Sequence, residues 1–398
     1  MSMTAKQYVI RLGWINLPLL LIVGALNYWI DAAATHHLPG ETSYFPRTTA
    51  HSALSKLHYL SINKPDTIYF GSSRTEVGLP PDPSLAGGGV YNAGLSGAGL
   101  GQVVPLARHV LELTQSKNVV IGLDFTSFSA EYAGNTELDK GLLTSNHLSY
   151  FVKRILVDLA QALSFKATQN SIISIFDKLN DIPYDGSYKS MSIRGQHSEA
   201  RMLKITEERG KTYRAFRKKM EAAFIKPSLH LGDEKSWRLL DGLLTEICEK
   251  NIVIRLYVHP VHALVTDVLR QNGSWQRFEQ WKSDLALRSR RYQQQQCDIK
   301  VVDFSGYNSI TTETIRNLLP TTSLQYYWEA SHYKSKVGEL ILKRLFSLDD
   351  GDLPSDFGRE LREDTITEVL AAIREEQTRY ITAHADEIAL AQQWANSK

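Results

Sequence analysis

Short apolar runs alternate with amphipathic segments along most of the chain. The runs are rich in β-branched and aromatic residues, which indicates strands, and most segments between them have the periodicity of helices. The predicted strands are residues 67–70, 89–92, 118–124, 252–258 and 299–304. Residues 119–121 and 253–254 are continuously apolar, as is typical of parallel strands buried on both faces. The pattern therefore predicts an α/β fold in which helices cover both sides of a parallel sheet.

A long insertion, about residues 130–232, separates the third and fourth predicted strands. Two helices are expected in it, because apolar residues recur at helical spacing. Their stripes are Leu148, Phe151, Val152, Ile155, Leu156, Leu159 and Leu163, then Ile172, Ile175, Phe176 and Leu179. We expect helices packed on the sheet or forming a lid; a membrane-surface role for the first is the alternative, since Lys153 and Arg154 lie off its stripe. The polar residues 187–210 predict a long loop.

Residues 12–30 form an apolar run without a charged side chain, about the length that a bilayer requires. Lys6 and Arg11 precede the run and Asp31 follows it, so the positive-inside rule places the N-terminus in the cytoplasm and the bulk of the chain across the membrane. We interpret the run as a membrane anchor, because it exceeds the roughly 7–15 residues of a signal-peptide core. The alternative is a cleaved signal peptide with its site at residues 32–34.

The order of these segments predicts four parts. Residues 1–31 are a cytoplasmic tip and anchor, residues 32–65 a stalk, residues 66–350 the α/β domain with its insertion, and residues 351–398 a C-terminal helix packed on the domain. This last part opens with a capping box at residues 365–368 and carries an apolar stripe. The stripe is Ile366, Val369, Ile373, Tyr380 and Ile388.

Composition narrows the class of protein. With 43% hydrophobic residues the chain can bury a sizeable core, and its net charge of +2 gives no global field that would attract nucleic acid. The two cysteines, Cys248 and Cys297, each precede a predicted strand. An exported compartment permits a disulfide between them, and a pair of buried free thiols is an equal alternative.

Three segments carry residues suited to acyl chemistry. Residues 68–74 are an apolar run that ends at Gly-Ser-Ser, the pattern of a strand that presents a hydroxyl at a sharp turn. The glycine-rich residues 91–99 can bring backbone N–H groups close to a ligand, and their spacing is not the GxGxxG of dinucleotide sites. Glu329 precedes His332 by three residues, so its carboxylate can hold the imidazole in one tautomer.

A zinc site is the competing interpretation of the histidines. His259 and His262 are its candidate ligands, but the sequence has no third ligand cluster with suitable spacing. We therefore expect neither a metal nor a cofactor.

The order of the three segments resembles the SGNH/GDSL-like hydrolase superfamily. The first block of that superfamily matches residues 71–73, with Ser72 in place of the usual aspartate, and implies Ser73 as nucleophile. The second block matches residues 92–97 and implies Gly97, beside the Ser73 N–H, as an oxyanion donor. The final block, normally Asp-x-x-His, matches residues 329–332 and implies His332 as base, with Glu329 in the place of the aspartate.

The third block departs from the superfamily pattern. It usually carries an asparagine that donates to the oxyanion, and here Asp124 occupies that position. Because an ionised carboxylate repels an oxyanion, we expect Asp124 to point away, to be protonated or to orient another group. The accessory candidates are Ser72, Arg74, Asn92, Asp124, His262 and Tyr333.

Gly-Ser-Ser blocks with one N-terminal anchor resemble a subgroup that includes the D-alanyl-transfer protein of teichoic-acid synthesis and the alginate O-acetylation proteins. The resemblance covers about residues 66–346 outside the insertion. It implies a flavodoxin-like α/β/α sandwich with five parallel strands, in a periplasmic acyltransferase or esterase that acts on an envelope or exported polysaccharide beside a multispanning membrane acyltransferase. The alternative is a glycan-binding scaffold without catalysis, motivated by the missing asparagine.

Overall fold

The computed structural model describes residues 4–32, 35–36, 52–128, 141–143, 147–180, 196, 202–203, 211–225, 234–316, 323–348 and 351–396. Several predicted segments lie wholly or mostly outside these residues. They are the signal-peptide site at 32–34, much of the stalk, and the loop at 187–210 apart from residues 196, 202 and 203.

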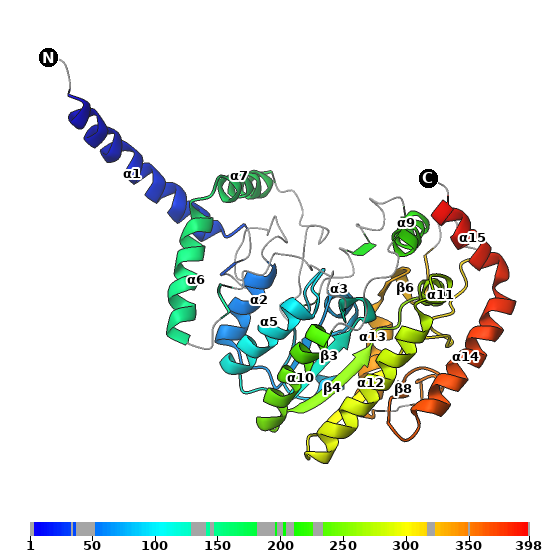
Figure 1. The fold of residues 1–398 in the computed structure, drawn as a ribbon. Coiled ribbons are helices and arrows are strands. Elements are labelled where there is room, and N and C mark those ends of the chain that lie inside the picture. The colour runs from blue at the N-terminus through cyan, green and yellow to red at the C-terminus, as the bar shows by residue number, and fades with distance from the viewer. Residues whose placement is uncertain are drawn as a thin grey trace.

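A six-stranded sheet in the order β2-β1-β3-β4-β5-β8 forms the centre of the fold (Figure 1). The strands are β1 (Thr67–Phe70), β2 (Val90–Asn92), β3 (Asn118–Leu123), β4 (Val253–Val258), β5 (Ile299–Asp303) and β8 (Arg359–Glu360). The first five are parallel and in the order of a flavodoxin-like sheet, whereas β8 runs antiparallel to β5. The predicted fold class is confirmed, and the extra strand β8 is too short to give a periodic signal.

Helices cover both faces of this sheet. One side carries α2 (Ser52–Ile62), α5 (Leu100–Leu113), α10 (Glu234–Glu249) and α12 (Trp275–Gln294), and the other carries α9 (Lys211–Ile225), α11 (Ala263–Gln271), α13 (Ser335–Phe346), α14 (Ile366–Ala383) and α15 (Ala385–Asn396). Short helices α3 (Ser73–Gly78), α4 (Pro83–Ala86) and η1 (Phe125–Phe128) complete the connections. Because consecutive strand residues face opposite sides, Val119 and Ile121 join the first core cluster and Val120 joins the second.

Both ends of the domain differ from the predicted division. Helix α2 falls in the predicted stalk, but Leu57 and Leu60 are fully buried in the core. The tail forms two helices, α14 and α15, in place of one, and Tyr380 and Ile388 pack in the second core cluster. Helix α14 begins after Thr365 as expected, yet that side chain makes no cap hydrogen bond, so the predicted capping box is not formed.

Helix α1 (Ala5–Ile30) extends away from the sandwich, and α6 (His147–Ala162) and α7 (Phe165–Leu179) lie beside its C-terminal end (Figure 1). In α1 the 25 residues Lys6–Ile30 are long and apolar enough to cross a membrane. The expectation that the stripes of α6 and α7 pack on the sheet is wrong, since Leu156 is 62% exposed and Phe176 is 60% exposed.

Cys248 and Cys297 form a disulfide, with their Cα atoms 5.4 Å apart. The bond joins the end of α10 to the turn before β5, and it decides between the two alternatives left open by the sequence. Disulfides persist in oxidising compartments. The disulfide and the apolar helix α1, as an anchor or a signal sequence, together suggest an extracytoplasmic location.

Candidate active site

Ser73 lies at a sharp turn between a buried strand and a helix. Strand β1 ends at Phe70, and Ser73 is the first residue of α3, with Ser72 as the N-cap. Parallel α/β sheets carry their functional groups at the carboxyl ends of the strands, and this turn lies at that edge. The structure thus has the strand, turn and helix that the Gly-Ser-Ser pattern predicted.

Glu329 and His332 face each other across a short hairpin that the sequence did not predict. Strands β6 (Tyr327–Glu329) and β7 (His332–Tyr333) are antiparallel, and these two residues are paired in register. The hairpin lies tightly against α3, because a Cβ atom on Gly78 would come within 2.1 Å of the Tyr333 ring. Only glycine allows this approach, which brings the hairpin next to the serine turn.

The three predicted relay residues are brought together. The Ser73 Oγ atom lies 2.8 Å from His332 Nε2, and His332 Nδ1 is paired with Glu329 Oε1. The Ser331 hydroxyl donates to the same carboxylate oxygen at 2.9 Å, and its N–H donates to the other oxygen at 3.2 Å. This is the order of nucleophile, base and orienting acid that acyl transfer by a serine requires.

The charge states of Glu329 and His332 suit His332 to act as a general base. Burial raises the pKa of Glu329, but His332 and the hydrogen bonds outweigh burial and lower the pKa to about 2. Burial lowers the pKa of His332 below its usual value, although Glu329 acts in the opposite direction. At neutral pH the carboxylate is therefore ionised and the imidazole neutral, so Nε2 can accept the proton of Ser73.

Asp124 follows β3 and turns toward the serine loop. Its Oδ2 atom accepts a 2.6 Å hydrogen bond from the Ser72 hydroxyl, and its Oδ1 atom is paired with Arg74. Arg74 in turn donates from Nε to the Ser331 carbonyl at 3.1 Å. Burial raises the pKa of Asp124, but the Arg74 charge, His259 and the hydrogen bonds from Ser72 and Arg74 together outweigh burial and lower the pKa, so the carboxylate is ionised. Of the three expected arrangements, Asp124 thus orients other groups: it clamps Ser72 and Arg74 to the end of β3.

A buried polar chain connects this clamp to α3. Thr75 Oγ1 lies 2.9 Å from the Tyr257 hydroxyl, which lies 3.2 Å from the Tyr333 hydroxyl. Tyr333 reaches His259 Nδ1 at 3.3 Å, and His259 Nε2 lies 3.9 Å from Asp124. Burial lowers the pKa of His259 to about 4, so this imidazole is neutral. Thr75 and Tyr257 were not predicted as residues of the site. In the sequence, only their position near the carboxyl ends of strands indicated such a role.

Asn92 fastens the second block to α3. Its amide donates to the carbonyls of Thr75 at 2.8 Å and Leu79 at 2.9 Å, and its Oδ1 atom accepts from the Gly94 N–H at 3.0 Å. Gly97 has a φ of 74°, which glycine adopts without strain. These contacts hold the loop that contains Gly97, whose oxyanion role stays a prediction.

A buried ion pair lies on another side of α3 and was also missed. Lys56 Nζ in α2 lies 2.9 Å from Glu76 Oε1, and both side chains have no exposed surface. Lys56 also donates to the Gly94 carbonyl, and Ser96 Oγ donates to Glu76 at 2.6 Å. The pair therefore joins α2, the serine helix and the loop before Gly97. No sequence motif marks it, because its partners come from separate elements.

The other accessory candidate, His262, serves a different part of the fold. It is the N-cap of α11, and its Nδ1 atom accepts from the Leu264 N–H at 3.2 Å. Its Nε2 atom contacts the Glu313 carbonyl at 2.7 Å, so its side chain fixes α11, while its backbone N–H donates to the Ala330 carbonyl at 3.0 Å, in the turn between Glu329 and His332. Within the described ranges, no group of three His, Cys, Asp or Glu side chains could hold a metal.

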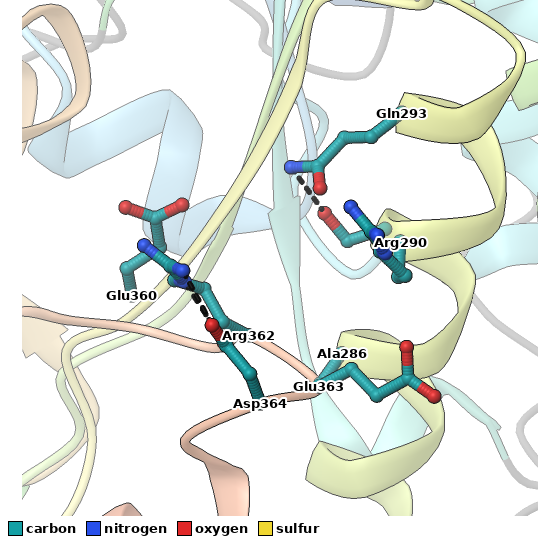
Figure 2. Close-up of a pocket in the computed structure, with 8 residues that line it drawn as sticks. Ala286, Arg290, Gln293, Glu360, Arg362, Glu363 and Asp364 are labelled. Carbon is teal, nitrogen blue, oxygen red and sulfur yellow. Dashed lines mark hydrogen bonds and ion pairs between the residues drawn. The ribbon is translucent and has the colours of Figure 1, made fainter.

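Two hollows lie at different distances from the relay of Ser73, His332 and Glu329. A cavity of about 90 Å³ lies beside Arg74 and Asp124 and is otherwise mostly apolar, with Phe125 and Phe278 in its wall. A larger groove of about 490 Å³ lies between α12 and residues 360–364, where charged side chains line it (Figure 2).

The larger groove lies far from the serine turn. Gln293 in its wall donates to the carbonyl of Ile299, the first residue of β5. Because β1 and β5 run in the same direction, the start of β5 and the turn after β1 lie at opposite edges of the sheet. The charged groove is therefore separate from the candidate active site.

Comparison with family models and with curated proteins gives no match for this chain. What stands from the structure is an α/β fold with a mostly parallel central sheet. The function is therefore inferred from the geometry of the site.

Proposed function

We propose that this protein is a membrane-anchored, extracytoplasmic acyltransferase or esterase that acts on an envelope or exported polysaccharide. The observation that carries the proposal is the 2.8 Å contact between Ser73 Oγ and His332 Nε2, with Glu329 on the other imidazole nitrogen. A serine and a histidine in contact can be structural. The strand-turn-helix position of the serine and the buried acid favour a nucleophile.

The proposed reaction has two halves. Ser73 Oγ attacks the carbonyl carbon of an acyl ester while His332 Nε2 takes the hydroxyl proton, and Glu329 stabilises the imidazolium that forms. The tetrahedral intermediate breaks its bond to the leaving alcohol, which receives the proton from His332. A sugar hydroxyl or water then gives its proton to His332 and attacks the acyl-serine, and His332 returns the proton to Ser73 Oγ as the bond between the acyl carbon and the serine breaks. The backbone N–H groups of Ser73 and Gly97 are the proposed oxyanion donors.

The clamp around Asp124 is compatible with this chemistry. Its carboxylate is paired with Ser72 and Arg74, so its charge is compensated near the developing oxyanion. The missing asparagine remains the observation that favours the alternative, a glycan-binding scaffold that keeps the fold without the reaction. Reactivity of Ser73 separates the two.

Contacts at the end of α1 support an anchor over a cleaved signal peptide. Asp31 Oδ1 accepts from the Thr35 N–H at 2.9 Å, and Arg154 of α6 donates to the Thr35 carbonyl. Asn27 donates to the Ala162 carbonyl at 2.7 Å. Cleavage at residues 32–34 would remove Asn27 and Asp31 from these contacts. The anchor, the exported domain and the resemblance of the blocks to polysaccharide O-acylation proteins support an envelope glycan as substrate, beside a multispanning acyltransferase as partner.

The catalytic part of the proposal is tested by trapping the acyl-enzyme. The full-length protein is incubated with an activated acetyl ester, quenched in acid and digested, and the peptide with residue 73 is examined by mass spectrometry. We expect an acetyl adduct that is lost in Ser73→Ala and in His332→Ala but kept in Ser84→Ala, a control at an exposed serine. Absence of the adduct from the folded wild type would favour the scaffold.

The location is tested separately. A reporter that is active only outside the cytoplasm is fused to the C-terminus. An active reporter is expected, because Lys6 and Arg11 precede the uncharged apolar run of residues 12–30. A silent reporter on a well-expressed fusion would remove the envelope substrate.

A further inference from the structure

Helix α7 has its polarity reversed relative to a helix of a water-soluble domain. Its outward side chains are apolar: Phe165 is 86% exposed and Leu179 is 78% exposed. On the opposite side Asn170, Ser171, Ser174 and Asp177 are buried. Soluble helices bury the apolar face and expose the polar one. Reversal of this order is typical of helices that contact lipid, where polar side chains face the protein.

Helix α6 also turns an apolar face outward, and its buried side carries Tyr150 as well as a charged residue. Leu148, Ile155 and Leu156 are exposed by 74%, 58% and 62%, whereas the charged side chain of Arg154 is buried. Arg154 is satisfied inside the protein, because it donates to the Leu54 carbonyl at 3.0 Å and pairs with Asp158 at 2.9 Å. The outward residues of α6 and α7 thus form one exposed apolar surface, which is larger than single scattered apolar residues would explain.

This surface continues the membrane helix. Asn27, near the end of α1, is buried and donates to the Ala162 carbonyl of α6 at 2.7 Å and to the Thr168 hydroxyl of α7 at 2.9 Å. A Cβ atom on Gly24 of α1 would lie 3.0 Å from the Leu163 side chain, so the helices are in close contact there. The α6–α7 junction is therefore fixed where α1 leaves its apolar span.

The lengths and charges of the two helices indicate how they meet a bilayer. Helix α6 has 16 residues and α7 has 15, fewer than the roughly 20 that span a bilayer. At helical spacing, Lys166 lies between the outward apolar face and the buried polar face of α7, and Lys178 is exposed in the last turn of the helix. Lysines at such flanks can reach phosphate groups while the apolar face enters the acyl region.

We propose that the outward faces of α6 and α7, together with the end of α1, form a lipid-contacting platform that lies on the bilayer leaflet at which α1 ends. The occupant is phospholipid. The platform fixes the height and tilt of the α/β sandwich above the membrane, which α1 alone, as a single helix, would leave free.

The test places a photoreactive benzoyl-phenylalanine at Leu156, at Phe176 or at Leu287 of the full-length protein. Leu287 is the control, because it is 48% exposed on α12, a helix of the sandwich away from α1. Each variant is reconstituted in vesicles of zwitterionic and anionic phospholipid with a clickable acyl chain, irradiated, and analysed for lipid adducts. We expect about tenfold more lipid adduct at the two platform positions than at the control.

Equal labelling at all three positions, or no adduct at Leu156 and Phe176, would overturn the proposal. The same variants are irradiated in native membranes. Adducts there with a second copy of the chain or with another membrane protein, in place of lipid, would also overturn it and would make the surface a protein interface. Because the substituted positions are exposed, folding is checked by thermal melting, and Ile172, 59% exposed on α7, is a substitute position if one variant is unstable.

Discussion

Replacement of Lys56 by Met is predicted to destabilise the domain strongly. Lys56 Nζ lies 2.9 Å from Glu76 Oε1, and neither side chain has exposed surface. Methionine fills a similar volume but leaves the Glu76 carboxylate buried without its countercharge. Loss of one partner of a buried pair costs about 3–5 kcal/mol in the free energy of unfolding.

The structure favours the lower end of that range. Glu76 keeps one strong partner in the variant, since the Ser96 hydroxyl donates to Oε2 at 2.6 Å. We therefore expect a loss of about 3 kcal/mol, which for a domain of this size corresponds to a fall in Tm of about 4–5 °C. The loop before Gly97 also loses its contact with Lys56 through the Gly94 carbonyl, so acyl-ester turnover should fall as well.

The assay is denaturant unfolding of the full-length protein, followed by circular dichroism. The double variant Lys56→Met with Glu76→Gln should regain most of the loss, because the amide still accepts from Ser96 and carries no charge. Lys117→Met is the matched control, since Lys117 pairs with Asp66 at the surface and should leave stability almost unchanged. A loss below about 1 kcal/mol in Lys56→Met, or no recovery in the double variant, would refute the reasoning.

Glu329→Gln should lower ester turnover by roughly 10⁴-fold with little change in Tm, because an amide cannot stabilise the imidazolium. Full activity in this variant would mean that another group orients His332. The acidic limb of the wild-type kcat/KM profile should have its midpoint below 6.5, since burial lowers the pKa of His332 and activity is lost as the imidazole takes up a proton. The midpoint measured on the residual activity of Glu329→Gln should be lower still, because the Glu329 carboxylate raises the pKa of His332. A midpoint above 6.5 in either protein would contradict the electrostatics of the site. Replacing Cys248 and Cys297 by Ser opens a loop of 49 residues and should cost about 4 kcal/mol in unfolding experiments, whereas a cost near zero would argue against the bond in the native protein.

The sheet was predictable because its strands are buried on both faces. Each of the five predicted strands agrees with the structure within one residue at either end. The hairpin that carries Glu329 and His332 was missed, since two very short strands and a turn without glycine give no periodic signal. The spacing of the two residues still indicated their pairing, because a short loop keeps residues at that separation close together.

The direction of an apolar stripe was not predictable from its period. The stripes of α6 and α7 have the spacing of a core helix, and the same spacing suits a helix that faces lipid. Only the burial of Ser171, Ser174 and Arg154 on the opposite sides distinguishes the two environments.

Ion pairs between separate helices were likewise not predictable from the sequence. Lys56 and Glu76 come from separate helices, and no local pattern links them. From the sequence we expected one of three arrangements for Asp124. The hydrogen bond from Ser72 and the pairing with Arg74 show that Asp124 orients other groups.

Covalent labelling shows whether Ser73 is a reactive nucleophile. A fluorophosphonate probe reacts with a serine whose hydroxyl is activated by a neighbouring base. Ser72 is the matched control, because its hydroxyl lies on the same turn but donates to Asp124 at 2.6 Å, whereas Ser73 Oγ lies 2.8 Å from His332 Nε2. The measurement is made on the purified full-length protein and on native membranes, where a partner could close the site.

We expect a probe adduct on Ser73 that persists in Ser72→Ala and vanishes in Ser73→Ala and in His332→Ala. A label that stays in Ser73→Ala, or no label on folded wild-type protein in either setting, would contradict a serine acyl-transfer site and leave the scaffold as the function of this fold.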